Sequence, residues 1–272
     1  MKHLMISLIL LALVIFTTAC SSSSSHSNHA GHDMDHMEDT EKMMVHMSWK
    51  LSTETLVPNQ TTTLTIKVRG HDTPYIEDFD VIHEKKMHLI VVSKNLSYFA
   101  HLHPTYAGKG EFTVALNVPQ AGAYTMFADF KPTGSAQVAE RYVMTAVGTA
   151  PVAKPLVADN TIVKEMAGKN VALAIDTLQT GKEATLKFSF KDMLTGKPIK
   201  DLEQYLGAIG HVVIISEDTQ KYLHVHPADD SEKGQTATFM TTFDQPGLYK
   251  AWGQFQHNGE VFTVPFTLQI TK

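Results

Sequence analysis

Short apolar runs of strand length recur along most of the chain, and clusters of Gly, Pro and Asn separate them. Within the runs, apolar residues either alternate with polar ones or follow one another without a break, and both patterns are typical of β-strands. Because many short strands at regular spacing are typical of a β-sandwich, the pattern predicts an all-β protein. In the first half of the chain the expected strands are Thr63–Val68, Met87–Val92, Tyr98–His103, Glu111–Val118, Ala123–Phe130 and Tyr142–Val147.

The same pattern occurs twice in the sequence. The segment Met87–Pro104 matches Gly210–Pro227, and Gln120–Phe130 matches Gln245–Phe255. A stretch rich in small residues and proline separates the two copies, as is typical of a linker. We therefore predict two tandem immunoglobulin-like β-sandwich domains. The expected boundaries are residues 45–149 for the first domain, 150–160 for the linker and 161–272 for the second domain.

The N-terminus has a different pattern. The apolar run Leu4–Phe16 is shorter than the roughly 20 residues that a membrane-spanning helix needs, and it fits the core of a secretory signal. The run ends in Thr-Thr-Ala-Cys, which resembles the lipobox of bacterial lipoproteins except at Thr17, where an aliphatic residue is usual. We expect a lipoprotein signal peptide at residues 1–19 and a lipid anchor on Cys20. The alternative is a plain signal peptide that is cleaved nearby.

Residues 20–44 contain serines, acidic residues, histidines and methionines but no aromatic or branched aliphatic side chain. Such a segment buries too little apolar surface to fold alone, so we expect a disordered, lipidated tether. Imidazole suits zinc, copper, iron and nickel, and thioether narrows the choice toward copper. The alternative is a solvated linker of biased composition. The candidate ligands of the tether are His26, His29, His32, Met34, His36 and Met37.

Cysteine content and charge exclude several classes of site. The chain has one cysteine in 272 residues, so an intramolecular disulfide and a cysteine-based metal motif are both excluded. A formal net charge of −5 argues against nucleic acid as a partner. After the leader no segment is long and apolar enough to span a membrane. We therefore expect the lipid alone to hold the protein on the extracytoplasmic face of the cell membrane.

Each copy of the repeat contains a His-x-His-Pro motif, with His101 and His103 in the first copy and His224 and His226 in the second. Side chains two residues apart in a strand share a face, so each pair should project together, outward or toward a rim of the sandwich. Two imidazoles on one face can share a metal ion. The alternative is that hydrogen-bonded histidines stabilise a turn.

A metal site needs further ligands beyond each pair. His88 and His211 occupy equivalent positions in the strand that precedes each motif, and a hairpin could bring them alongside. The first copy adds His83 and Met87, and the second copy has no ligand at either position. We therefore expect the first domain to hold the stronger site. A thioether ligand would also make it the better site for Cu(I).

These motifs resemble a known family. The segments His83–Pro104 and Ala121–Gly134 are similar to bacterial secreted or lipid-anchored domains of the YtkA-like, immunoglobulin-like kind, which often accompany copper-handling systems. The resemblance implies small β-sandwiches, a role in metal handling at the cell surface and no catalysis. It also implies a shared histidine motif, represented here by His83, Met87, His88, His101 and His103 in the first copy and His211, His224 and His226 in the second.

The leading hypothesis is sequestration or delivery of copper outside the membrane, with zinc as the other candidate metal. The expected partners are the metal ion, the membrane through the lipid anchor, and another copper-handling protein. The alternative is a cell-surface adhesion or partner-binding module with structural histidines. No carboxylate pair, nucleophile elbow or phosphate loop accompanies the histidines, so we do not expect an enzyme. Because ligation needs neutral imidazoles, we expect metal binding to weaken below about pH 6.5.

Overall fold

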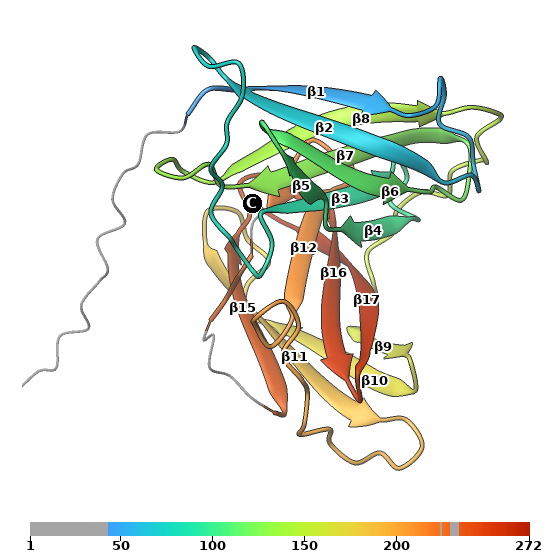
Figure 1. Ribbon diagram of the computed structural model, residues 1–272. Coiled ribbons are helices and arrows are strands. Elements are labelled where there is room, and N and C mark those ends of the chain that lie inside the picture. Colours follow the sequence, from blue (N-terminus) through green and yellow to red (C-terminus); the bar gives the residue numbers. More distant parts are fainter. Residues whose placement is uncertain (1–42, 224, 229–233) are drawn as a thin grey trace, which may run out of the picture. The chain divides into compact units, whose positions relative to one another are not determined.

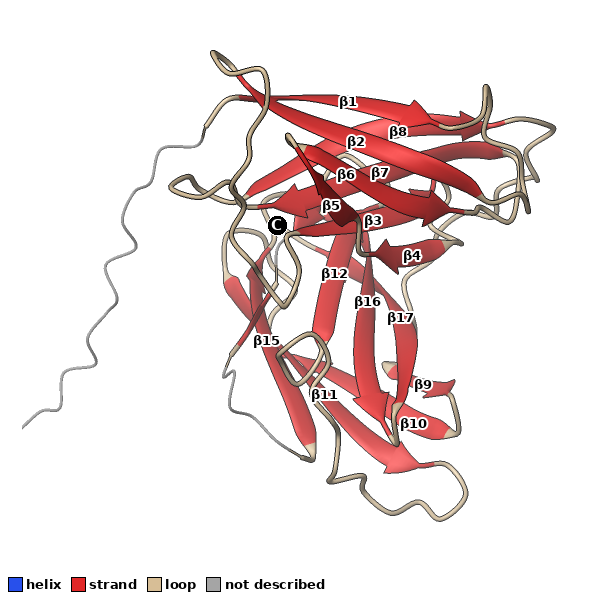
Figure 2. Ribbon diagram, viewed as in Figure 1, coloured by secondary structure: helices blue, strands red, loops and turns tan. Residues whose placement is uncertain are grey.

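Figure 1 shows the computed structural model of the chain, which describes residues 43–223, 225–228 and 234–272. The regular structure of these residues consists of strands (Figure 2), which confirms the all-β fold class. No helix in these ranges has the length and apolar character needed to cross a membrane. The signal peptide at residues 1–19, Cys20 and His224 lie outside the described residues, as do the tether candidates His26, His29, His32, Met34, His36 and Met37.

The first sandwich consists of two antiparallel sheets with strand orders β1-β2-β6-β5 and β4-β3-β7-β8. Alternation in β2 shows why the strands pack: Leu64, Ile66 and Val68 are fully buried, whereas the residues between them are half-buried. Each such side chain contributes about 1.5–3 kcal/mol on burial. The strands are β1 (Val45–Leu51), β2 (Thr62–Gly70), β3 (Met87–Ser93), β4 (Phe99–Leu102), β5 (Thr105–Gly108), β6 (Glu111–Leu116), β7 (Gly122–Phe130) and β8 (Val138–Ala146).

The second sandwich repeats this arrangement, with strand orders β14-β15-β11-β10-β9 and β13-β12-β16-β17. Strands β10 and β11 take the places of β1 and β2, and β9 adds an edge strand. Its core is separate from that of the first sandwich. The strands are β9 (Val163–Met166), β10 (Lys169–Ile175), β11 (Glu183–Asp192), β12 (His211–Ser216), β13 (Tyr222–Leu223), β14 (His226–Pro227), β15 (Thr236–Thr242), β16 (Gly247–His257) and β17 (Glu260–Ile270).

A third buried cluster joins the two sandwiches. In β3, Leu89 and Val91 pack into the core of the first sandwich, whereas Ile90 and Val92 belong to the third cluster. Strand β3 is therefore covered on both faces, which explains its unbroken apolar run. The buried members of the cluster are Ile90, Val92, Leu96, Phe127, Val213, Ile215 and Trp252. Sheet β4-β3-β7-β8 thus packs against sheet β13-β12-β16-β17.

This cluster shows that one sequence-based expectation was wrong. The histidine face of the first sheet was expected to point outward or toward a rim, yet the second sandwich covers it. Residues Asp39–Lys272 accordingly form one compact unit. Polar contacts supplement the apolar ones: Arg141 Nε donates to the carbonyl oxygen of Thr219 at 2.8 Å, and Lys250 Nζ donates to that of Leu96 at 2.8 Å.

The interface uses the same patch of both repeats. Phe99 stacks on Trp252 with ring centroids 4.8 Å apart, and Tyr222 stacks on Phe127 at 5.2 Å. In the sequence repeat, Phe99 is equivalent to Tyr222 and Phe127 to Trp252. The two stacked pairs are thus the same contact made twice with the repeats exchanged, as in an interface of approximate two-fold symmetry.

Candidate metal centre

Five histidines gather where β3 and β12 begin: His83, His88, His101, His103 and His211. The ring centroids of His88 and His101 are 5.1 Å apart, those of His88 and His103 5.2 Å, and those of His101 and His103 4.6 Å. The ring of His211 lies 4.9 Å from those of His83 and His101 and 5.4 Å from that of His88. The structure therefore brings together five of the eight candidates predicted in the folded domains.

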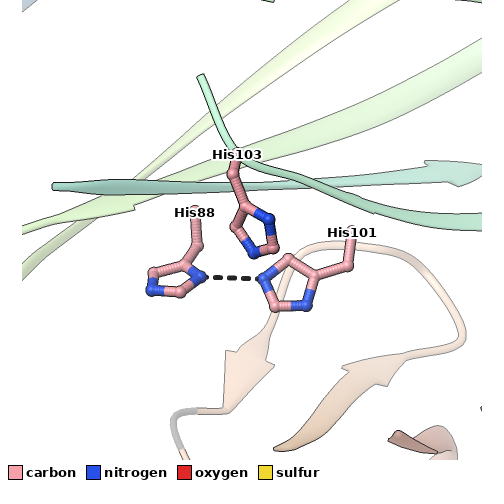
Figure 3. Close-up of side chains that lie close together, drawn as sticks. All are labelled: His88, His101 and His103. Carbon is pink, nitrogen blue, oxygen red and sulfur yellow. Dashed lines mark hydrogen bonds between the residues drawn. The ribbon is translucent and has the colours of Figure 1, made fainter. Parts of the chain in front are cut away.

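Strand alternation determines how three of these rings converge. His88 follows the face of β3 that carries Ile90, and His101 is the register partner of Ile90 in β4. His103 lies just beyond β4. As Figure 3 shows, the three imidazoles point toward one another, and one ligand nitrogen from each lies within 4.8 Å of the others. The predicted convergence of His88 with the His-x-His pair of the first copy is thus present.

The hydrogen bonds of two rings determine which nitrogens carry protons. His88 Nε2 lies 2.9 Å from the carbonyl oxygen of Ile82, and His101 Nδ1 lies 2.7 Å from Oε1 of Gln254. Because carbonyl and amide oxygens only accept, each of these nitrogens donates its N–H, and a neutral imidazole has no second N–H. Hence His88 Nδ1 and His101 Nε2, which face each other at 2.9 Å, both present lone pairs.

Two facing lone pairs repel unless a proton or a cation lies between them. Two nitrogens bound to one metal ion at about 2.0 Å, with an angle of about 90–110° between them, are about 2.8–3.3 Å apart. The observed 2.9 Å between His88 Nδ1 and His101 Nε2 falls within this range. In addition, His103 Nε2 is buried and has no hydrogen-bond partner among the described residues. The donor set therefore fits a metal ion.

Protons compete weakly for these nitrogens. Burial lowers the pKa of His101 to about 3; nearby His88 lowers this pKa as well, while the hydrogen bond with Gln254 raises it. Burial, followed by the charges of His88 and Lys85, lowers the pKa of His103 to about 4. Both rings are neutral at neutral pH and keep their lone pairs well below it. For any metal ion held by these two rings, protons would therefore compete only at a lower pH than the expected 6.5.

His83 lies in a tight turn that precedes β3. Ile82 and Lys85 exchange backbone hydrogen bonds of 2.9 and 3.1 Å across the turn, and the two central residues, His83 and Glu84, have φ values of 47° and 64°. Such turns favour Gly, Asn or Asp at both central positions. A residue other than Gly with positive φ costs about 1–2 kcal/mol. The turn also orients the Ile82 carbonyl that accepts from His88.

A buried carboxylate lies beside the histidines. Asp129 is 3% exposed and is the register partner of His88 in β7. Tyr222, from the second sandwich, donates to its Oδ2 at 2.9 Å, and Gln137 Nε2 donates to its Oδ1 at 2.6 Å. The negative charge of Asp129 raises the pKa of His101, so it acts in the direction that favours a cation at the site.

The remaining candidates are placed differently. Met87 was expected to be a ligand, but its side chain is fully buried in the core of the first sandwich. The reason is alternation, because Met87 and His88 are adjacent in β3 and point to opposite faces. His226 forms part of β14, but its side chain and all of His224 lie outside the described residues. No second histidine site is therefore described.

Sequence reasoning missed Gln254 and Asp129. Gln254 lies in β16 and is the register partner of His211, and Asp129 lies in β7 and is the register partner of His88. Each lies on the interface face of its sheet, in the strand next to the one that carries the histidine. Glutamine and aspartate have no distinctive spacing here. A usable signal was the unbroken apolar run of β3 and β12 in both copies, which indicates strands buried on both faces.

Comparison with known families gives one match. A model described as a domain of unknown function, DUF8832, matches residues 42–147 and again residues 164–272. No curated protein shows a significant match to the sequence. The expected resemblance to YtkA-like domains is not tested by these matches and stays a prediction.

Several solved structures show a weak similarity to this chain. The Escherichia coli adhesin FdeC is 13% identical over 83% of this chain and 64% of its own, with a TM-score of 0.29. The Yersinia pseudotuberculosis adhesin InvE is 12% identical over 82% of this chain and 59% of its own, with a TM-score of 0.27. Domains 4 and 5 of the S-layer protein SbsC are 13% identical over 85% of this chain and 100% of theirs, with a TM-score of 0.24.

This chain therefore spans less than two thirds of both adhesin chains. With TM-scores below 0.5 these similarities carry no argument about function, so the functional argument rests on the site.

Proposed function

The chain belongs to the family defined by the DUF8832 domain, and we propose that this member binds a transition metal ion, copper above all, through His88, His101 and His103. The observation that carries the proposal is that His88 Nδ1 and His101 Nε2 lie 2.9 Å apart with their lone pairs facing each other. Ligating histidines usually donate their other N–H to a carbonyl or carboxylate oxygen. Both rings have such an acceptor, in Ile82 and Gln254.

The chemistry of the ligands favours Cu(II) among divalent ions. The three ligands are imidazoles, which suit copper and zinc, and Cu(II) binds nitrogen sites most tightly in the first transition row. Met87 packs in the core, so the folded site lacks the thioether ligand on which its predicted preference for Cu(I) depended. Any Cu(I) preference would have to come from the methionines of the tether.

The setting that we propose for this activity is the extracytoplasmic face of the membrane. The apolar leader and Cys20 support export and lipid anchoring. There the protein would sequester copper or pass it to another copper-handling protein, and we propose no catalysis. A Cys20→Ser variant should leave the membrane fraction and appear in the soluble extracytoplasmic fraction, whereas retention in the membrane would contradict the lipid anchor.

Titration of residues 39–272, the compact unit that contains all three buried clusters, tests metal binding without the tether. We expect one tightly bound Cu(II) per chain. That site should be lost when leucine replaces His101, and also when leucine replaces His103, which is the more exposed of the two histidines. His46→Leu, which removes an imidazole from β1, is the matched control and should bind as the parent does. Absence of stoichiometric binding by the folded parent unit would refute the proposal.

A structural role for the histidines is the second candidate, as expected for a partner-binding surface module. The observation that favours it is the His101–Gln254 hydrogen bond, which joins residues 153 positions apart and links the two sandwiches. In that case His101→Leu should lower the free energy of unfolding while leaving metal uptake unchanged. Measuring both quantities on the same variant separates the two functions.

A further inference from the structure

We propose that His211 of the second sandwich is the fourth ligand of this site, so that a bound metal ion holds the two sandwiches together. The inference rests on the proposed metal binding by His88, His101 and His103. The sequence left open whether the two repeats share one site, and the proposal assigns the histidine of the second repeat to the site of the first.

Ring separations support a shared ion. A histidine nitrogen bound at about 2.0 Å places its ring centre about 3.1 Å from the metal, so two ligands at angles of about 90–110° have ring centres about 4.4–5.1 Å apart. The His101–His211 separation of 4.9 Å falls inside this range, and the His88–His211 separation of 5.4 Å lies just above it. The His101–His211 separation also falls within the 4.6–5.2 Å found among the three rings of the first sandwich, and the His88–His211 separation exceeds that range by 0.2 Å.

The approximate two-fold symmetry of the interface explains why these rings meet. His88 and His211 are equivalent positions of the two repeats, and their rings stack with an interplanar angle of 20°. The turns that precede them also meet at equivalent positions, because a Cβ at Gly207 would lie 3.6 Å from Glu84 Cγ. Residues near a two-fold axis contact their own equivalents, so duplication of one histidine places two imidazoles at the same point.

The surroundings of His211 suit a ligand that bridges the sandwiches. The next residues on the same face of β12, Val213 and Ile215, belong to the interface cluster. The register partner of His211 is Gln254, which also accepts from His101. The second sandwich thus supplies both an imidazole and a carboxamide oxygen to the same site. Imidazole nitrogens suit copper and zinc, so four of them form a donor set that fits either ion.

Binding across an interface couples metal occupancy to domain packing. An ion that contacts both sandwiches binds only when they are packed together, so it stabilises the packed state by mass action. Hydrogen exchange of the β12 and β16 amides should therefore slow on addition of Cu(II). An ion bound by His88, His101 and His103 alone would protect the β3 and β4 amides from exchange but not those of the second sandwich.

The test compares residues 39–272 with the His211→Leu, His211→Gln and His46→Leu variants under Cu(II) titration, electron paramagnetic resonance and hydrogen exchange. For His211→Leu we expect one ion still bound, affinity lower by about 10–100-fold, one nitrogen fewer in the hyperfine pattern, and loss of copper-dependent protection in β12. His211→Gln should show the same losses and guards against a folding defect caused by the leucine. The His46→Leu control should match the parent in all three measurements.

Three outcomes are distinguishable. If the parent unit binds no copper, the proposed function fails. If it binds copper and both His211 variants keep the parent affinity, nitrogen count and β12 protection, the shared site is refuted while metal binding by the triad stands. If the His211 variants lose all three, the shared site is supported.

Discussion

Replacement of Gln254 by leucine should weaken metal binding, although Gln254 is not itself a ligand. The Oε1 of Gln254 accepts the Nδ1–H of His101 at 2.7 Å and so keeps the proton away from Nε2. Without this acceptor, the proton of the neutral ring can move to Nε2 and donate to His88 Nδ1, only 2.9 Å away. The variant would thus replace two facing lone pairs with an internal hydrogen bond that metal binding must break.

The magnitude follows from two contributions. Loss of a hydrogen-bond partner behind a ligating histidine typically costs 10–100-fold in metal affinity. The new His101–His88 hydrogen bond adds about 0.5–1.5 kcal/mol in favour of the metal-free state. Together these predict that the affinity for Cu(II) falls by about 20–1,000-fold, since about 1.4 kcal/mol corresponds to a factor of ten.

Competition against a chromophoric chelator at pH 7.4 measures the change in Cu(II) affinity, with each variant made in residues 39–272. Gln256→Leu is the matched control, since Gln256 lies on the same strand and donates instead to Glu203. Gln254→Glu keeps an acceptor oxygen and should retain affinity within a few-fold of the parent or increase it. If Gln254→Leu and Gln256→Leu bind copper equally well, the assignment of protons between His88 and His101 is wrong.

Three further predictions concern the metal-free protein. The folded chain keeps His101 and His103 neutral, with pKa values of about 3 and about 4, whereas the unfolded chain protonates them near pH 6.5. The free energy of unfolding should therefore fall as the pH drops from about 6.5 toward about 4, by up to about 1.4 kcal/mol per pH unit for His101 and by less for the partly exposed His103, where solvent screens the charge. Urea denaturation at each pH measures this, and a flat profile would contradict it. His103→Leu should leave urea stability unchanged or raise it, because it removes a buried nitrogen without a described hydrogen-bond partner, and a large loss would show that the ring is structurally essential. Trp252→Ala, which empties the interface opposite Phe99, should cost about 3–5 kcal/mol in the same assay, and a cost below 1 kcal/mol would mean that the interface adds little to stability.

Much of the fold was predictable because it depends on local pattern. The period-two alternation of Leu64, Ile66 and Val68 determines which side chains share a face, and the duplicated motifs require two similar domains. The first half nevertheless contained strands that were not expected as such, including β5 (Thr105–Gly108). This strand is short and lacks a clear apolar alternation, so tertiary pairing with β6 rather than its own sequence defines it.

The histidine site was predictable only in part. Spacing alone indicated that His101 and His103 share a face and that His88 lies on a neighbouring strand. The same spacing misplaced Met87, because adjacent strand residues cannot both reach one site. It also gave no indication of Gln254, whose contact with His101 crosses 153 positions of sequence.

What the sequence determined by itself was therefore the class of structure, its duplication and the side chains that can act together within one strand. The tertiary structure decided which face of each sheet is covered. An alternating pattern specifies the two faces of a strand. Whether the histidine face is buried depends on the docking of a second sheet, and the sequence of one strand does not specify that docking. That docking covers His88 and His101, lowers the pKa of His101 and places His211 beside them, because equivalent strands of the two repeats meet face to face.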